Sequence, residues 1–543
     1  MKRKGRLAPT IGKMSHEHGT RTRVDPPGLS KPFGLQPPAC GLPRKGSILV
    51  FDSAPCRKCH SVSRGPYMAR DNLSVLLVTM LAVTPLFACA GSTSPRSASP
   101  PVSRAVAASP AVVAATTPVT PPLPPGVPDS PAGRQLTWVL GAMTSAPSES
   151  EVTAHFTQEF LAKVPAPTVI GLFRQIAAAS PFTVESVSPS KESRPDELVA
   201  VVRPSRGPRV SVVLAVDSAS SRMRGLLFRP KLDVKLAESW EEVQGALRAV
   251  APLVSFLAAE VDGGKCVPIS SIEPQKPLAL GSTFKLYVLD ALARQVASGK
   301  HGWNDPVAVQ DALKSLPPGA MREEPDGKTF PIHYFAEQMI SVSDNTAADH
   351  LLALVGRKAV EDAVKASGHA APARLQPFLS TREAFALKML SSPDERKAYV
   401  AADVAHKRTL LGAYAQRDTA SAMAQTVSSE EPISIDTIEW FASAEDLCKV
   451  MVDLHARADV AATAPVPAIL SKNPGIPDEN KQYAYVGFKG GGEPGVLNVT
   501  WLLQRARDGK WLVLTAGFNN PVSAVDELKA FAATASAREF LGR

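Results

Sequence analysis

Residues 278–297, LALGSTFKLYVLDALARQVA, contain the strongest structural signal in the chain. Gly281 precedes Ser282-Thr283-Phe284-Lys285, and an apolar run over 286–296 follows at once. This run predicts a long apolar helix that begins near Ser282. A serine at a helix start is usually a cap, but Ser282 and Lys285 are one turn apart on such a helix and share a face. Their side chains can therefore meet inside a cleft.

The elements expected around this helix form one domain over residues 236–543. A helix over 236–250 and strands over 254–261 and 266–272 are expected before the Ser282 helix, and a helical middle is expected after it. The chain then ends with strands over 483–489, 497–505 and 511–519 and an amphipathic helix over 522–541. Asp508-Gly509 between the last two strands is a strong hairpin signal. Strands at both ends of a helical middle predict an α+β fold, with one antiparallel sheet covered by helices.

Two further motifs follow the Ser282 motif along the chain. These are Ser343-Asp344-Asn345 and Lys489-Gly490-Gly491. In this order the three motifs resemble those of the class A β-lactamases and penicillin-binding proteins, which are serine hydrolases, and the resemblance covers roughly 300 residues. A second match to the first motif, Ser188-Pro189-Ser190-Lys191, has no companion motifs, and we interpret it as an exposed loop.

The resemblance implies catalytic roles for three residues. Ser282 would be the nucleophile, and Lys285 the base that takes its proton, because a serine hydroxyl is a poor nucleophile until a neighbouring base acts on it. A lysine can do this only if burial and other cations lower its pKa. Ser343 would relay the proton to the leaving nitrogen, and Asp344 would hold its loop by hydrogen bonds.

Substrate binding would fall to the residues around the other two motifs. Asn345 would offer its amide to the substrate, while Lys489, Gly490 and Gly491 would line the strand edge on which the substrate lies. Lys489 would also be the cation that faces Lys285 across the cleft. By the same resemblance the N–H groups of Ser282 and Gly492 would form the oxyanion hole.

The chain departs from the family at two places. Gly490 stands where the family has a hydroxyl residue, and Asn498 or Val499 stands where class A enzymes often have an arginine for the substrate carboxylate. The Glu-x-x-Leu-Asn motif, whose glutamate activates the deacylating water, is absent between the second and third motifs. Glu383 and Glu439 are candidates for that base, although an exposed carboxylate at a helix start is the favoured interpretation of both. The sequence therefore supports acylation better than fast hydrolysis.

A smaller region precedes this domain, over residues 133–232. Its pattern predicts three helices followed by four strands, over 136–144, 152–161, 168–178, 182–187, 198–203, 209–216 and 223–229. Helices followed by antiparallel strands predict a small α+β domain. The layout resembles the fold of ketosteroid isomerase and nuclear transport factor 2, but no carboxylate is placed for isomerase chemistry, so we expect a binding or packing role.

The first 132 residues carry targeting signals. Met68-Ala69-Arg70, an apolar run over 73–87 and Cys89 resemble a bacterial lipoprotein signal, in which Cys89 is lipidated and becomes the mature N-terminus. The apolar run is shorter than the roughly 20 residues that a transmembrane helix usually needs. Residues 1–67 are then a disordered upstream extension or the product of a mispredicted start, and residues 90–132, rich in Pro, Ser and Ala, are a disordered tether. Cys56-Arg57-Lys58-Cys59-His60 matches a c-type haem attachment motif, but it precedes the export signal.

Composition narrows the remaining classes of partner and cofactor. The net charge of +9 is spread along the chain, partly in its first seventy residues, which argues against nucleic-acid binding. No histidine pair has zinc-site spacing, and we expect neither metal nor cofactor; His301, His333 and His350 are interpreted as surface or packing residues. Of the six cysteines only Cys266 and Cys448 lie in the expected folded regions. Two unpaired buried thiols are favoured, and a single bridge between them is left open.

Three functions remain open from the sequence. The first is a β-lactamase-like hydrolase that forms an acyl-enzyme on Ser282 with a β-lactam or a related amide or ester. The second is a penicillin-binding, D,D-peptidase-like enzyme acting on cell-wall peptides, and the third a non-catalytic binding lipoprotein with a decayed site. The two-domain layout is similar to that of the β-lactamase-like lipoproteins of clavulanic acid gene clusters, a group in which fold alone does not establish lactamase activity. In each case we expect an exported protein, lipid-anchored at the cell envelope.

Overall fold

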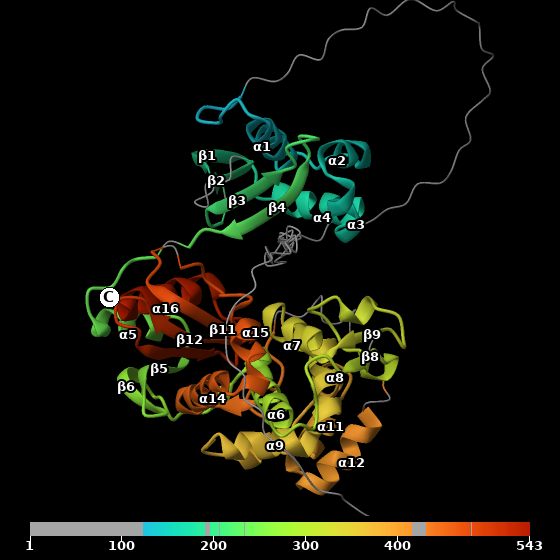
Figure 1. Cartoon of the computed structure of the whole chain (residues 1–543), viewed down its shortest axis with the longest axis vertical. Helices are drawn as coiled ribbons and strands as arrows, with labels where there is room; N and C mark the ends of the chain where they lie inside the picture. The colour runs from blue at the N-terminus through green and yellow to red at the C-terminus, as the bar shows by residue number, and fades with distance from the viewer. Residues whose placement is uncertain are drawn as a thin grey trace, which may run out of the picture. The chain divides into compact units, whose positions relative to one another are not determined.

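The computed structural model describes residues 123–189, 196–205, 207–232, 234–414, 417, 431–478 and 480–543. Two folded regions within these ranges are described separately below (Figure 1). The expected upstream extension, the export signal with Cys89, and most of the tether lie outside the described residues. No helix among the described residues is both long enough and apolar enough to cross a membrane.

The smaller region has four helices followed by a four-stranded antiparallel sheet. Its elements are α1 (Pro131–Ala142), α2 (Glu149–His155), α3 (Gln158–Lys163), α4 (Ala166–Ala177), β1 (Phe182–Pro189), β2 (Glu197–Pro204), β3 (Val210–Val216) and β4 (Met223–Pro230). Each strand pairs with the next in the chain, so the order in the sheet is β1-β2-β3-β4. This is the α+β arrangement expected from the sequence. The likeness to ketosteroid isomerase and nuclear transport factor 2 stays a prediction.

Two boundaries in this region differ from expectation. Val127 and Ala132 are buried in its core, so the folded region begins before residue 133. The prolines there suggested a tether, but Pro131 is the first residue of α1, where its missing N–H costs no hydrogen bond. The single helix expected over 152–161 is divided, because Phe156 is extended and bridges to Met223.

The larger region is built on a five-stranded antiparallel sheet. Its strands are β5 (Leu253–Asp262), β6 (Lys265–Ile272), β11 (Tyr483–Glu493), β12 (Val496–Arg505) and β13 (Trp511–Asn519), in the order β11-β12-β13-β5-β6. The pairing of β13 with β5 joins the two ends of the region, as the strand pattern predicted. Strand β11 is left at one edge of the sheet, and this edge carries the third motif.

Helices cover both faces of the sheet (Figure 1). One face packs against α5 (Trp240–Arg248) and α16 (Glu527–Gly542), and both helices are shorter than expected. The other face packs against α6 (Lys285–Ala297) and α14 (Ala444–Ala456), with the helical middle beyond them. That middle comprises α7 (Ile332–Ser341), α8 (Asn345–Val355), α9 (Arg357–Ala366), α10 (Thr381–Met389), α11 (Pro393–Ala401), α12 (Val404–Tyr414) and α15 (Pro465–Ser471). The short strands are β7 (Leu278–Ala279), β8 (Pro306–Ala308), β9 (Thr329–Pro331) and β10 (Phe441–Ala442).

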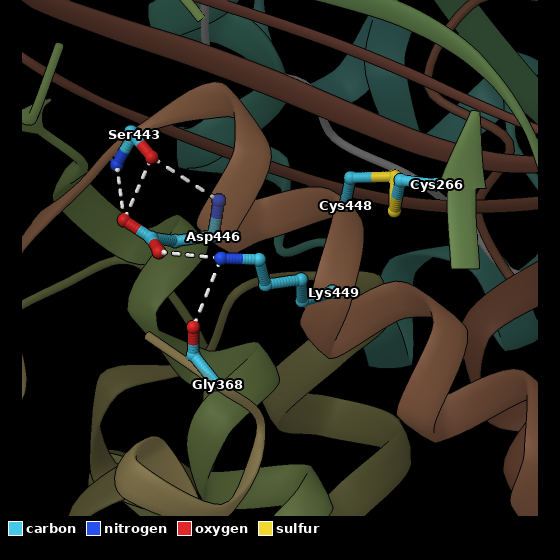
Figure 2. The surroundings of a disulfide bond; sticks show 6 residues. All are labelled: Cys266, Gly368, Ser443, Asp446, Cys448 and Lys449. Carbon is cyan, nitrogen blue, oxygen red and sulfur yellow. Dashed lines mark hydrogen bonds and ion pairs between the residues drawn. A yellow bond between two sulfur atoms is a disulfide. The ribbon is translucent and has the colours of Figure 1, made fainter. Parts of the chain in front are cut away.

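A disulfide joins Cys266 on β6 to Cys448 on α14. The expectation of two unpaired thiols was therefore wrong. Packing of α14 across the sheet brings the two Cα atoms to 6.4 Å, within the range that a disulfide spans, although 182 residues separate them along the chain. Figure 2 shows that the start of α14 is also held by polar contacts: Asp446 binds Ser443 and pairs with Lys449, which donates to the carbonyl of Gly368.

Candidate active site

Ser282 lies in a tight turn rather than in the first turn of the long helix. The turn is a 3₁₀ segment, Gly281–Phe284, and Lys285 is the first residue of α6. Gly281 has φ +50°, a backbone conformation that favours glycine. The expected meeting of the two side chains is present, since Lys285 Nζ lies 3.1 Å from Ser282 Oγ.

Lys285 is completely buried among oxygen atoms. Its Nζ lies 2.6 Å from the backbone O of Ser343, 3.1 Å from Ser343 Oγ and 2.7 Å from Asn345 Oδ1, in addition to Ser282. Burial lowers the pKa of Lys285 to about 7, even though the charges of Asp344 and Asp349 act to raise it. A substantial fraction of this amine is therefore uncharged near neutral pH and able to accept a proton.

The second motif brings Ser343 between two lysines. Ser343 has φ +60°, and its Oγ accepts hydrogen bonds from Lys285 and, at 3.0 Å, from Lys489 Nζ. Asp344 holds the loop as expected: it caps α8 by accepting from the N–H of Ala347 at 2.8 Å and accepts from the N–H of Met321 at 2.9 Å. A helix cap and a site loop therefore coincide in this motif.

The side chain of Asn345 is hydrogen-bonded within the protein at both of its polar atoms. Its Nδ2 donates to the carbonyls of Leu316 at 3.0 Å and Pro317 at 2.9 Å, and its Oδ1 accepts from Lys285. The amide is thus fully hydrogen-bonded within the protein, and it could reach a substrate only if the carbonyls of residues 316 and 317 moved. In the structure this amide positions Lys285, and its substrate-binding role stays a prediction.

Lys489 is buried on β11, 2% exposed, opposite Lys285. Its Nζ contacts Ser343 Oγ and, at 2.5 Å, the carbonyl of Gly490. Burial, together with the charge of Lys285, holds the pKa of Lys489 well below its usual value. The proton relay expected from the resemblance thus has its four polar atoms in contact, in the order Ser282 Oγ, Lys285 Nζ, Ser343 Oγ and Lys489 Nζ.

The glycine run on β11 lies directly against the turn that carries Ser282. A Cβ on Gly491 would lie 2.3 Å from the carbonyl O of Leu280 and 2.5 Å from the N of Ser282. A Cβ on Gly281 would lie 2.7 Å from the N of Gly492. Only glycine permits this approach, and it places the backbones of Ser282 and Gly492, the expected oxyanion-hole donors, side by side.

Both candidate deacylation bases are in other environments than expected. Glu383 does begin a helix, α10, but it is buried and forms a bidentate ion pair with Arg357, at 2.7 and 3.0 Å, besides a capping box with Ser380. Glu439 is also buried and does not begin a helix, because it precedes β10 and α14 begins only at residue 444. Neither is the exposed helix-start carboxylate expected from the sequence.

Glu439 belongs to a cluster that sequence reasoning missed. Lys388 of α10 donates to Glu439 at 2.7 Å and to Glu493 at the end of β11. The position of Glu493 directly after the glycine run was a usable signal, whereas nothing in the sequence pointed to Lys388. The second Ser-x-x-Lys match belongs to the smaller region. Ser188 lies in β1 and pairs with Val199, so the match begins in a strand and not in the expected loop, and Lys191 lies outside the described residues.

Comparison with protein families supports the resemblance for the larger region. Residues 239–450 match the model of the beta-lactamase enzyme family. Residues 127–221, in the smaller region, match the model described as the N-terminal part of the ORF 12 gene product. The larger region is therefore similar to the beta-lactamase enzyme family, as its motifs suggested. A comparison with curated proteins gave no match.

Several solved structures are similar to part of the chain. A beta-lactamase from Sphaerobacter thermophilus DSM 20745 is 20% identical, with 56% of this chain and 98% of that chain covered and a TM-score of 0.39. A beta-lactamase from Chitinophaga pinensis DSM 2588 is 15% identical, with coverages of 55% and 97% and a TM-score of 0.39. A variant of PBP-A, solved as an acyl-enzyme complex with penicillin G, is 13% identical, with coverages of 55% and 95% and a TM-score of 0.38.

Proposed function

Starting from a beta-lactamase-like fold, we propose that the chain is a serine hydrolase that forms an acyl-enzyme on Ser282 with a β-lactam or a related amide or ester. The observation that carries this proposal is the contact between Ser282 Oγ and the Nζ of Lys285, a buried amine whose pKa is lowered to about 7. A buried, partly neutral lysine next to a serine supplies the base that the hydroxyl needs.

The proposed acylation uses the contacts around Ser343. Uncharged Lys285 takes the proton of Ser282 as its Oγ attacks the substrate carbonyl carbon. The hydroxyl of Ser343 then passes its proton to the leaving nitrogen or oxygen and is reprotonated by Lys285, which becomes uncharged again, while Lys489 stabilises the hydroxyl from the other side. The N–H groups of Ser282 and Gly492 receive the developing oxyanion. One such donor contributes roughly 2.7–4 kcal/mol to transition-state stabilisation in other serine hydrolases.

A penicillin-binding, D,D-peptidase-like enzyme is the second candidate. The environment of Glu383 favours it, because a carboxylate in a bidentate ion pair and a capping box is poorly placed to activate water. Such an enzyme would keep its acyl group longer than a lactamase does. The third candidate, a binding lipoprotein with a decayed site, is disfavoured by the intact contacts of Ser282, Lys285, Ser343 and Lys489.

We also propose that the protein is exported and anchored to the cell envelope through a lipid on Cys89, facing a small β-lactam or cell-wall peptide substrate. The Cys266–Cys448 disulfide supports this location, because disulfides form and persist mainly outside the cytoplasm.

Intact-mass spectrometry of the full chain after incubation with a fluorescent penicillin tests the proposed acylation. We expect a single covalent adduct on the wild-type protein and none on Ser282→Ala. Ser188→Ala is the matched control, since it removes the serine of the other Ser-x-x-Lys match and should leave the adduct unchanged. A lasting adduct would favour the penicillin-binding candidate, and drug turnover without one a lactamase. No adduct and no turnover with several β-lactams would reject β-lactam acylation.

A further inference from the structure

Strand β11 presents alternate residues to the turn that carries Ser282. Its pairing with β12 is regular here, with Lys489 opposite Thr500, Gly491 opposite Asn498 and Glu493 opposite Val496. Side chains at every second position of a strand share a face. The side chains of Lys489 and Glu493 therefore leave β11 on the face on which Gly491 contacts the Ser282 turn. Lys489 lies on one side of that contact, toward Ser343, and Glu493 on the other.

Glu493 lies close to a second carboxylate, that of Glu439, whose neighbour in the chain packs against the Ser282 turn. Glu439 precedes Trp440, whose carbonyl accepts from the N–H of Leu280 at 3.0 Å, two residues before Ser282. The ring of Trp440 stacks on Phe284 of the turn, with the ring centroids 3.8 Å apart. Both carboxylates bind the ammonium group of Lys388, so the cluster of Lys388, Glu439 and Glu493 lies beside the nucleophile's turn.

Solvent reaches this cluster through Glu493. The side chains of Lys388 and Glu439 are 4% and 2% exposed, whereas that of Glu493 is 23% exposed. Two carboxylates and one ammonium in a buried place favour a state that holds one extra proton. In agreement, burial and the neighbouring Glu439 raise the pKa of Glu493 to about 8, against the opposing effect of Lys388. A carboxylate pair of this kind can accept a proton near neutral pH and return it.

We propose that Glu493, supported by Glu439 and Lys388, is the base that activates water to hydrolyse the acyl-enzyme. The inference rests on the proposed function. In the step, the ionised Glu493 carboxylate takes one proton from water while the water oxygen bonds to the acyl carbonyl carbon. The bond from that carbon to Ser282 Oγ then breaks, and Oγ takes a proton from the hydroxyl of Ser343 by way of the amine of Lys285, which ends uncharged. Product acid leaves, and the proton that Glu493 returns to solvent balances the one that Ser343 takes up from solvent. This base would take the place of the family glutamate that the sequence lacks.

The test separates acylation from deacylation in the full chain. Acylation is followed by intact mass, and decay of the adduct after removal of the free penicillin gives the deacylation rate. For Glu493→Gln we expect acylation to change less than about threefold and deacylation to slow by roughly 100-fold or more, the usual size of a general-base contribution. Glu527→Gln is the matched control: its carboxylate lies 3.9 Å from the point where a Cβ of Gly492 would be, on the other face of β11.

The pH profile of the wild-type protein provides a readout that does not depend on the folding of any variant. Because only ionised Glu493 can accept the proton, deacylation should rise with pH up to about 8 and then level off. This rise of the deacylation rate with pH should be absent from Glu493→Gln. Unchanged deacylation in the variant, a wild-type rate without the rise, or an equal loss of acylation and deacylation would each overturn the inference, the last by showing a purely structural role. Absence of both an adduct and drug turnover in the wild-type protein would instead reject the proposed function and the inference together.

Discussion

The pH dependence of acylation tests the central feature of the site, the lowered pKa of Lys285. With a pKa of about 7, the uncharged fraction of this amine grows from about 9% at pH 6 to about 91% at pH 8. Acylation of Ser282 should therefore rise about tenfold over this range and reach a plateau above pH 8. A lysine of ordinary pKa, about 10.4, would instead give about a 100-fold rise over the same range and no plateau below about pH 10.

The measurement is a single-turnover experiment. The full chain is mixed with excess penicillin at each pH and quenched in acid at set times. Intact-mass spectrometry then gives the fraction of acylated protein, so that only the rate of the acylation step is measured. Ser282→Ala gives the background at each pH. A log-linear rise that continues beyond pH 9, or a rate that falls between pH 6 and pH 8, would refute uncharged Lys285 as the base.

Three variants test the packing of the larger region. Gly491→Ala should abolish acylation and lower the free energy of unfolding by roughly 1–3 kcal/mol, because its methyl group would collide with the backbone of the nucleophile's turn. Gly412→Ala is the control, since no atom lies within 4 Å of the position of its new methyl group. Equal acylation in both variants would contradict the close approach of Gly491 to the turn. Replacing Cys266 and Cys448 together by serine should lower the free energy of unfolding by about 2–4 kcal/mol in urea titrations, and an unchanged midpoint that is also insensitive to reductant would argue against the bridge. Trp440→Ala should cost about 3–5 kcal/mol through the lost ring packing; a loss below 1 kcal/mol in the same titration would show that the stack contributes little.

Local signals account for what the sequence could predict. The sheet strands around the Asp508-Gly509 turn and the meeting of Ser282 with Lys285 depend on residues close together in the chain, and both are present in the structure. The succession of helices and then strands was equally readable in the smaller region, apart from the break at Phe156, which a tertiary bridge to a distant strand imposes.

Contacts between distant segments account for what it could not predict. The disulfide depends on how α14 crosses the sheet, and Lys388 reaches Glu493 only after α10 and β11 have packed. The hydrogen bond from the amide of Asn345 to the carbonyl of Leu316 could not be predicted, because a sequence motif does not show which backbone carbonyls of a distant loop lie nearby. The burial of Glu439 could not be predicted either, because its sequence context is that of a surface carboxylate and its partners come from distant segments.

The pairing of β5 with β13 also bears on the order in which the protein can fold. Leu253 pairs with Asn519, and their numbers differ by 266, so β5 leaves the ribosome long before its inner neighbour exists. At typical rates of synthesis this interval is roughly 13 to 53 s, during which an apolar strand has an unpaired edge. Such non-local pairing slows folding and exposes intermediates to aggregation. Ser282 is likewise made well before Gly492, so a chain that stops between α6 and β11 contains the nucleophile but neither its oxyanion partner nor the complete sheet.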